Sequence, residues 1–142
     1  MIPYYCNEAV LQLPNVHTLL DQTRQCLEVV TVEGTELQLV IERARLTPNA
    51  TLSSAVEASI AERRRSLRGF ELASLVEREF PEIVGVEARV TFVDKERGPL
   101  FVHEFHCVIE QVRVSYLASC RLAQAAACDV WMHTMLQHLR LQ

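Results

Sequence analysis

Hydrophobic and polar residues alternate along the first part of this chain, a pattern typical of β-strands. Residues 22–32 and 35–46 both alternate, and Glu33-Gly34 between them supplies a turn, so we predict an antiparallel hairpin. One face of this hairpin is consistently apolar and is the expected core: Leu27, Val29, Leu37, Leu39 and Ile41. The other face is mixed, with Cys26, Val30, Val40 and Ala44 interleaved with Arg24, Gln38 and Glu42.

Elsewhere in the chain the spacing of hydrophobic residues predicts both strands and helices. Residues 4–13 end at Leu13-Pro14, which predicts an edge strand followed by a turn because proline cannot continue a central strand. Asn49 and Thr51 are candidate N-caps for a helix whose stripe contains Leu52, Val56, Ile60, Arg63 and Leu67, with Gly69 placed to end it. Strands are then predicted at 70–80, 84–94, 100–110 and 112–119, followed by a helix at 122–140.

This order of elements predicts an α+β fold. Strands outnumber helices and follow one another directly, which favours an antiparallel sheet of about six to seven strands with two helices packed on it. The 142 residues, with 49% hydrophobic residues and only 4 Gly and 5 Pro, suit one domain over 1–142 without a linker.

Charge and cysteine content narrow the function classes. A net charge of -4 makes a nucleic-acid partner unexpected. The five cysteines have no C-x-x-C spacing, and the first residues lack the basic and apolar regions of a signal peptide. Charged residues interrupt the most apolar stretch, Leu117 to Leu139. We therefore expect reduced thiols and a cytoplasmic protein that is not inserted in a membrane.

Candidate catalytic and metal-binding groups do not form a recognisable site in the sequence. His103 and His106 are three apart on a predicted strand, so they face opposite sides, and we expect no metal. His106 and Cys107 also point apart, and Cys107 is in phase with an apolar face. We expect no cofactor and no enzymatic activity.

Arg63-Arg64-Arg65 is the most basic cluster, and Arg68 follows one turn later. The cluster holds no aromatic residue for stacking on bases, so we interpret it as a solvated helix face paired with Glu57, Glu62 or Glu71.

The mixed sheet face is the strongest functional signal. In the 100–108 strand, Leu100, Val102 and Val108 alternate with Glu104 and His106, which continues the mixed character of the hairpin. A half-apolar face with amide, hydroxyl and charged neighbours suits a recognition surface. The alternatives are a face buried in a homodimer or an exposure that the fold tolerates.

The order of several short motifs resembles the DcrB-like Eag chaperones of bacterial type VI secretion. These motifs span about residues 4–110: Tyr4, Asn7-Glu8, Leu13-Pro14, Asp21-Gln22-Thr23, Leu39-Val40-Ile41-x-Arg43, Leu52, Val56 and Leu67-x-Gly69-Phe70. The C-terminal residues match only in general helical character.

The resemblance implies a PsbP-like α+β fold, a cytoplasmic homodimer and no catalysis. Such chaperones bind the N-terminal transmembrane helices of effectors that carry a PAAR domain, often of the Rhs type, until the effector loads onto the VgrG spike. The client helices lie in a groove made by one sheet face and the edge of the first helix. Carried onto this chain, the implied groove residues are Arg24, Cys26, Val40, Ser59, Arg63, Leu67, Leu100 and Glu104.

This sequence departs from the family pattern at three of those positions. Arg24 and Arg63 stand where small or apolar groups are expected, and Glu104 stands where a neutral amide would suit. The alternative hypothesis is a non-catalytic structural or assembly protein of a secretion apparatus, with the same fold but no transmembrane client.

Overall fold

The structure is a computed structural model that describes residues 2–5, 10–13 and 24–141. It contains these elements in order: β1 (Ile2–Tyr5), β2 (Val10–Leu13), β3 (Gln25–Val30), β4 (Glu36–Arg45), α1 (Leu52–Ser66), β5 (Glu71–Glu79), β6 (Val84–Asp94), β7 (Gly98–Ile109), β8 (Val112–Arg121), a 3-10 turn (Leu122–Gln124) and α2 (Ala125–His138). The predicted α+β fold is confirmed.

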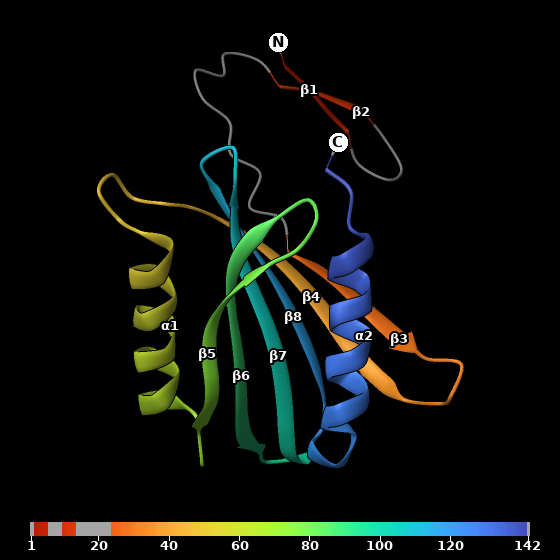
Figure 1. Ribbon diagram of the computed structural model, residues 1–142. Helices are drawn as coiled ribbons and strands as arrows, with labels where there is room; N and C mark the ends of the chain where they lie inside the picture. The colour runs from red at the N-terminus through yellow and green to blue at the C-terminus, as the bar shows by residue number, and fades with distance from the viewer. Residues whose placement is uncertain (1, 6–9, 14–23, 142) are drawn as a thin grey trace.

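Six of the strands form one antiparallel sheet in the order β3-β4-β8-β7-β6-β5 (Figure 1). The hairpin predicted around Gly34 is β3–β4, with Cys26 opposite Val40 and Leu27 opposite Leu39. The last strand in the chain, β8, lies between β4 and β7, so the first hairpin meets the rest of the sheet only through β8.

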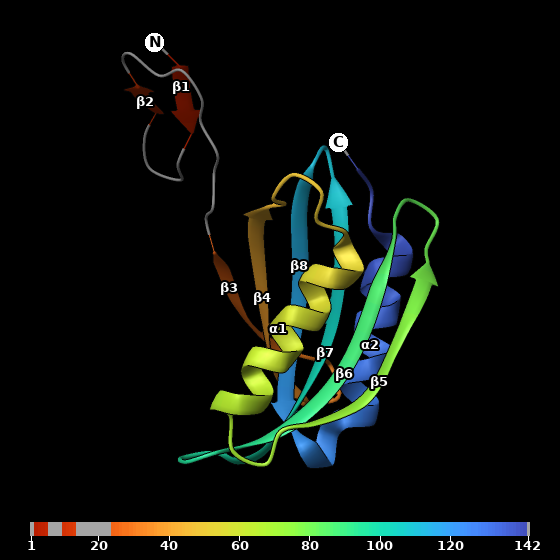
Figure 2. The same ribbon diagram turned by 90° about the vertical axis from the view of Figure 1, so that its left-hand side faces the viewer.

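The two helices cover opposite faces of the sheet, with α1 in front and α2 behind in Figure 2. On the α2 side, Leu37, Leu39, Phe101 and Phe105 pack with Met132 and other apolar residues in the larger core. On the α1 side, a smaller core joins Val56 and Ile60 to Val86 and Ala88 of β6. Because α1 packs over only this part of the sheet, one half of the sheet face on the α1 side is covered by the helix and the other half is open.

The ends of α1 explain its limits. The Thr51 hydroxyl accepts the Ser54 backbone N–H at 3.0 Å, and the Ser54 hydroxyl oxygen accepts the Thr51 backbone N–H at 3.1 Å, which closes a reciprocal N-cap. Of the two candidate caps, Thr51 is therefore correct. Asn49 lies in the preceding turn, where its φ is 69°. The helix ends at its C-cap Leu67, which is extended, so it stops two residues before Gly69, and Gly69 with φ 63° lies in the turn that leads into β5.

Three expectations need correction. The edge strand predicted at 4–13 is wrong, because β1 and β2 pair with each other in a separate two-stranded sheet. Leu27 is not a core residue, because it is 50% exposed at the outer strand. The mixed face is also not wholly open, because α1 packs over its β6 side. Of the motifs behind the family resemblance, Asn7-Glu8, Pro14 and Asp21-Gln22-Thr23 lie outside the described residues.

Candidate functional site

The open half of the sheet face on the α1 side is the candidate site. Strand pairing places Cys26 beside Val40, Val40 beside Leu117, and Leu117 beside Glu104, so these side chains form one row across β3, β4, β8 and β7. With α1 as its wall, this row forms what we call the α1-side groove. The groove is formed by residues far apart in the sequence because β8 joins the hairpin to β7.

A hollow of about 600 Å³ lies in the α1-side groove. Ser59 of α1 lines it on the helix side, and Arg24, Glu42 and Ser115 line it on the sheet side. Arg24 reaches back to Glu42, with 3.3 Å between Nε and Oε1. The polar lining of this hollow includes this salt bridge, the two serine hydroxyl groups and the charged side chains of Arg43, Glu62 and Arg113, so it can accept hydrogen-bonding groups as well as apolar ones.

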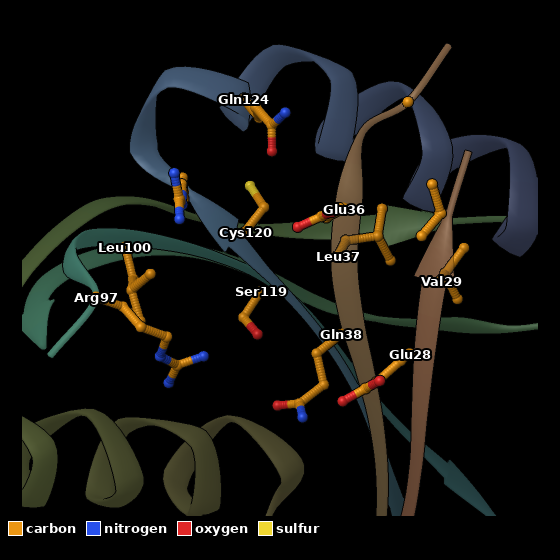
Figure 3. Close-up of a pocket in the computed structure, with 13 residues that line it drawn as sticks. Glu28, Val29, Glu36, Leu37, Gln38, Arg97, Leu100, Ser119, Cys120 and Gln124 are labelled. Carbon is orange, nitrogen blue, oxygen red and sulfur yellow. The ribbon is translucent and has the colours of Figure 1, made fainter. Parts of the chain in front are cut away.

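A second hollow of about 500 Å³ lies where the β3–β4 turn and the start of β7 come together. It is lined by Leu100, Gln38 and Ser119, among others (Figure 3). In Figure 3 the polar ends of Glu28, Gln38 and Arg97 point to the side of the sheet that carries α1. Leu100 is therefore in the groove region, but it lines a different hollow from Ser59 and Arg24.

Arg63 and Glu104 join α1 to the floor of the groove. The guanidinium makes two hydrogen bonds to the carboxylate, and the Nη2–Oε1 distance is 3.0 Å. The Arg63 guanidinium also lies 5.6 Å from the centre of the Phe70 ring. The expectation that this arginine pairs with Glu57, Glu62 or Glu71 on a solvated face is wrong. Its partner is a fully buried carboxylate on β7.

Glu104 is held in its ionised form. Burial by itself would raise the pKa of its carboxyl, but hydrogen bonds from His106 and Arg63 outweigh burial, and the pKa lies below its usual value. His106 donates from Nε2 to Glu104 Oε1 at 2.9 Å. Its Nδ1 then accepts from the Ser115 hydroxyl at 2.7 Å and from Arg113 at 3.2 Å. This network needs only a neutral imidazole, and it fixes the tautomer.

Most of the implied groove residues do lie on this face. Cys26 is exposed, Ser59 is half-buried, and Leu67 is half-buried at the C-cap of α1. Val40, however, is only 5% exposed, so this implied groove residue offers a client almost no surface in the free protein. The sequence places Leu117, Ser115 and Arg113 on a predicted strand but not in the groove, because alternation within residues 112–119 does not indicate that β8 lies beside β4.

The structure bears directly on the chemistry weighed from the sequence. His106 and Cys107 point to opposite faces, and burial raises the pKa of the Cys107 thiol to about 11, so this thiol is a poor nucleophile. His103 and His106 do face opposite sides. His103, however, meets Glu87 and His133 instead, and these three residues could hold a metal ion. The opposite orientations of His103 and His106 therefore do not exclude a metal site at His103. Among the described residues, no helix is long and apolar enough to cross a membrane.

Comparison with known proteins places the fold and nothing finer. No protein-family model matches the sequence, and no curated protein matches it. Among solved structures, the chain is similar to the crystal structure of a Pseudomonas aeruginosa protein of unknown function, PA94, described there as "Putative Regulator". The TM-score is 0.78 with 17% sequence identity, over 100% of this chain and 97% of that one. At this identity the likeness concerns the fold alone.

Proposed function

We propose that this protein is a non-catalytic chaperone of the DcrB-like Eag type, which shields the N-terminal transmembrane helices of a secreted effector. The observation that carries the proposal is the α1-side groove, a sheet face that is half apolar and half polar and is walled by a single helix. The client class, an effector with a PAAR domain and often of the Rhs type, comes from the family resemblance. So do the loading of the client onto VgrG and the cytoplasmic location.

The groove has the chemistry that such a client needs. A transmembrane helix exposes about 20 apolar residues, and it aggregates in water unless they are covered. Covering them stabilises the complex by about 25 cal/mol for each Å² of apolar area removed from water. Cys26 and Leu117 offer such area, because neither is buried in the free protein.

Polar groups along the groove suit the remaining surface of the client. Small residues such as Gly, Ala and Ser let transmembrane helices approach closely, and hydrogen bonds between helices add to their association. Ser59, Gln38 and Ser119 line the two hollows and present hydroxyl and amide groups at the wall and floor. These groups would replace the contacts that client helices make with each other in a bilayer.

Two neighbouring residues on β3 give a matched test. Cys26 and Leu27 are both exposed, but Cys26 lies on the groove face and Leu27 on the opposite face. Cys26→Asp should fold, and it should lose an effector's N-terminal segment in co-purification because it places a charge against an apolar helix. Leu27→Asp should keep that segment. Equal retention by both variants would contradict the groove assignment, whereas a failure of the parent itself to co-purify with the segment would favour a structural protein without a transmembrane client.

We further propose that the chaperone is a homodimer, as the family resemblance implies, with an interface that leaves the α1-side groove free for the client. Light scattering at micromolar concentration should give twice the 16.2 kDa mass of the chain. A stable monomer in the absence of client would overturn the dimer while leaving the groove proposal standing.

A further inference from the structure

We propose that Glu87, His103 and His133 form a binding site for a divalent transition-metal ion, most suited to Zn²⁺. This site lies on the α2 side of the sheet, on the opposite face from the α1-side groove. It does not depend on the proposed chaperone function. Glu87 belongs to β6, His103 to β7 and His133 to α2, so an ion here would join two strands to the C-terminal helix.

The three donor atoms are spaced as ligands of one ion. Glu87 Oε2 lies 3.2 Å from His103 Nε2 and 2.8 Å from His133 Nε2, and all three atoms lie within 4.8 Å of one another. In tetrahedral zinc sites the metal–ligand distances are about 2.0–2.1 Å, which puts neighbouring ligand atoms roughly 3.3 Å apart. Two imidazoles and one carboxylate are also a donor set that Zn²⁺ takes in proteins.

The hydrogen bonding of His103 leaves its inner nitrogen without a partner. Nδ1 donates to Asp129 Oδ1 at 2.6 Å, which in the neutral ring leaves a lone pair on Nε2. The His103 side chain is 0% exposed, and Nε2 has no hydrogen-bond partner even though Glu87 Oε2 is near. The buried Nε2 lone pair and the Glu87 carboxylate oxygen are two hydrogen-bond acceptors that face each other and repel. A cation bound between them would be attracted to both atoms and would satisfy both.

Asp129 supplies the outer contact that zinc-binding histidines usually have. A carboxylate that accepts the second ring N–H fixes the tautomer and orients the ligand nitrogen toward the metal. Arg89 holds Asp129 in turn, with Nε 3.2 Å from Oδ1. Asp129 and His133 are one helical turn apart on α2, so one helix provides both a ligand and the positioning residue of another ligand.

A metal ion can reach the site from solvent, and the Arg78 guanidinium competes with it for the Glu87 carboxylate. His133 is 45% exposed and lines a hollow of about 430 Å³ together with Arg78 and Phe80. Arg78 faces Glu87 from β5, with 3.5 Å between Nε and Oε1. Because half of the Arg78 side chain is exposed, it can turn to solvent when an ion binds. Its charge lowers the affinity, so its removal should raise the affinity.

The experiment titrates Zn²⁺ into the whole protein, stripped with a chelator, by calorimetry. All variants carry Cys26→Ser, so that the exposed Cys26 thiol cannot compete for the ion. One equivalent should bind. His133→Ala should lose at least tenfold in affinity, whereas His138→Ala, an exposed histidine on the same helix outside the cluster, should bind as the parent does.

Two further variants test the arrangement around the ion. Asp129→Asn should weaken binding by about 10- to 100-fold, as loss of such outer contacts does elsewhere. Arg78→Gln should tighten it severalfold. With Co²⁺ in place of Zn²⁺, the spectrum should show tetrahedral bands without a thiolate charge-transfer band. Equal binding by His133→Ala and His138→Ala, or no stoichiometric binding by the parent, would overturn the metal site. Glu87, His103 and His133 would then be held together by hydrogen bonds alone.

Discussion

The Arg63 guanidinium on α1 and the Glu104 carboxylate in the middle of β7 are joined by two hydrogen bonds, although the residues are 41 positions apart in the chain. The pair links α1, which forms the wall of the α1-side groove, to β7, which forms part of its floor. Its carboxylate is buried and also accepts from His106, so the helix position and the polarity of the groove depend on the same atoms.

Removing one member of this pair should cost more than removing both. Arg63→Ala leaves Glu104 buried without its main partner, and we expect a loss of about 3 kcal/mol in the free energy of unfolding. Arg63→Leu combined with Glu104→Leu should recover only part of that loss, because the buried His106 Nε2–H then loses its acceptor. Urea unfolding measures both. Arg64→Ala, at an exposed neighbouring position, should change stability by less than about 0.5 kcal/mol.

The stability that Glu104 contributes should depend on acid pH. Its folded pKa lies below the usual value, and the groups facing it are the guanidinium groups of Arg63 from α1 and Arg113 from β8, together with the His106 imidazole from β7. The contribution is fully present above the unfolded pKa of about 4.3 and is lost as pH falls through the folded pKa. The gap in urea midpoint between the parent and Glu104→Gln should therefore shrink on acidification. A gap that is constant from pH 7 to pH 3 would contradict this.

Gly85 should be the least replaceable of the described glycines. A Cβ at this position would lie 2.1 Å from the backbone oxygen of His106 and 2.9 Å from Phe105 Cζ. Gly85→Ala must push two central strands apart, and we expect a loss of at least about 2 kcal/mol. Gly98→Ala meets no atom within 4 Å and should cost only about 1 kcal/mol for its φ of 77°. Thermal unfolding followed by circular dichroism ranks the two.

Thiol labelling should report on the groove. Cys26 is exposed, whereas Cys107, Cys120 and Cys128 are buried, so Cys26→Ser should remove one fast-reacting thiol from the native protein. A bound client segment should protect the Cys26 thiol in the parent. If the client leaves the labelling rate of Cys26 unchanged, it binds elsewhere.

Leu39→Asp and Val40→Asp should both unfold the protein. Leu39 is 4% exposed in the α2-side core, and Val40 is 5% exposed on the other face, so either carboxylate would be buried without a partner. Loss of the far-ultraviolet circular dichroism of both variants is the expected result. A well-folded Val40→Asp variant would show that the centre of the groove floor opens to water.

Local pattern was sufficient to predict most elements. Residues 84–94 form β6 with those bounds, and the helix after Thr51 begins where its cap predicts, because alternation and capping are encoded by neighbouring residues. Which strands become neighbours was not encoded in this way. Nothing in 112–119 indicates that β8 inserts between β4 and β7, and the groove depends on that insertion.

The candidate sites show the same limit. The mixed face was visible from the alternation of polar and apolar residues, but the partner of Arg63 was not, because β7 lies far from α1 in the sequence. His103 looked isolated because its neighbours Glu87 and His133 come from another strand and from the last helix. A sequence signal for this cluster did exist in Asp129 and His133, four residues apart on a predicted helix.

The place of β8 in the sheet has a consequence for biosynthesis. The β3–β4 hairpin is made early, but the second edge of β4 has no partner strand until residues 112–121 leave the ribosome. Strands β5, β6 and β7 can pair in the meantime as a continuous meander, since each contacts the next along the chain. Chain growth therefore delivers last the strand that joins the hairpin to the meander, and the six-stranded sheet cannot close before β8 is available.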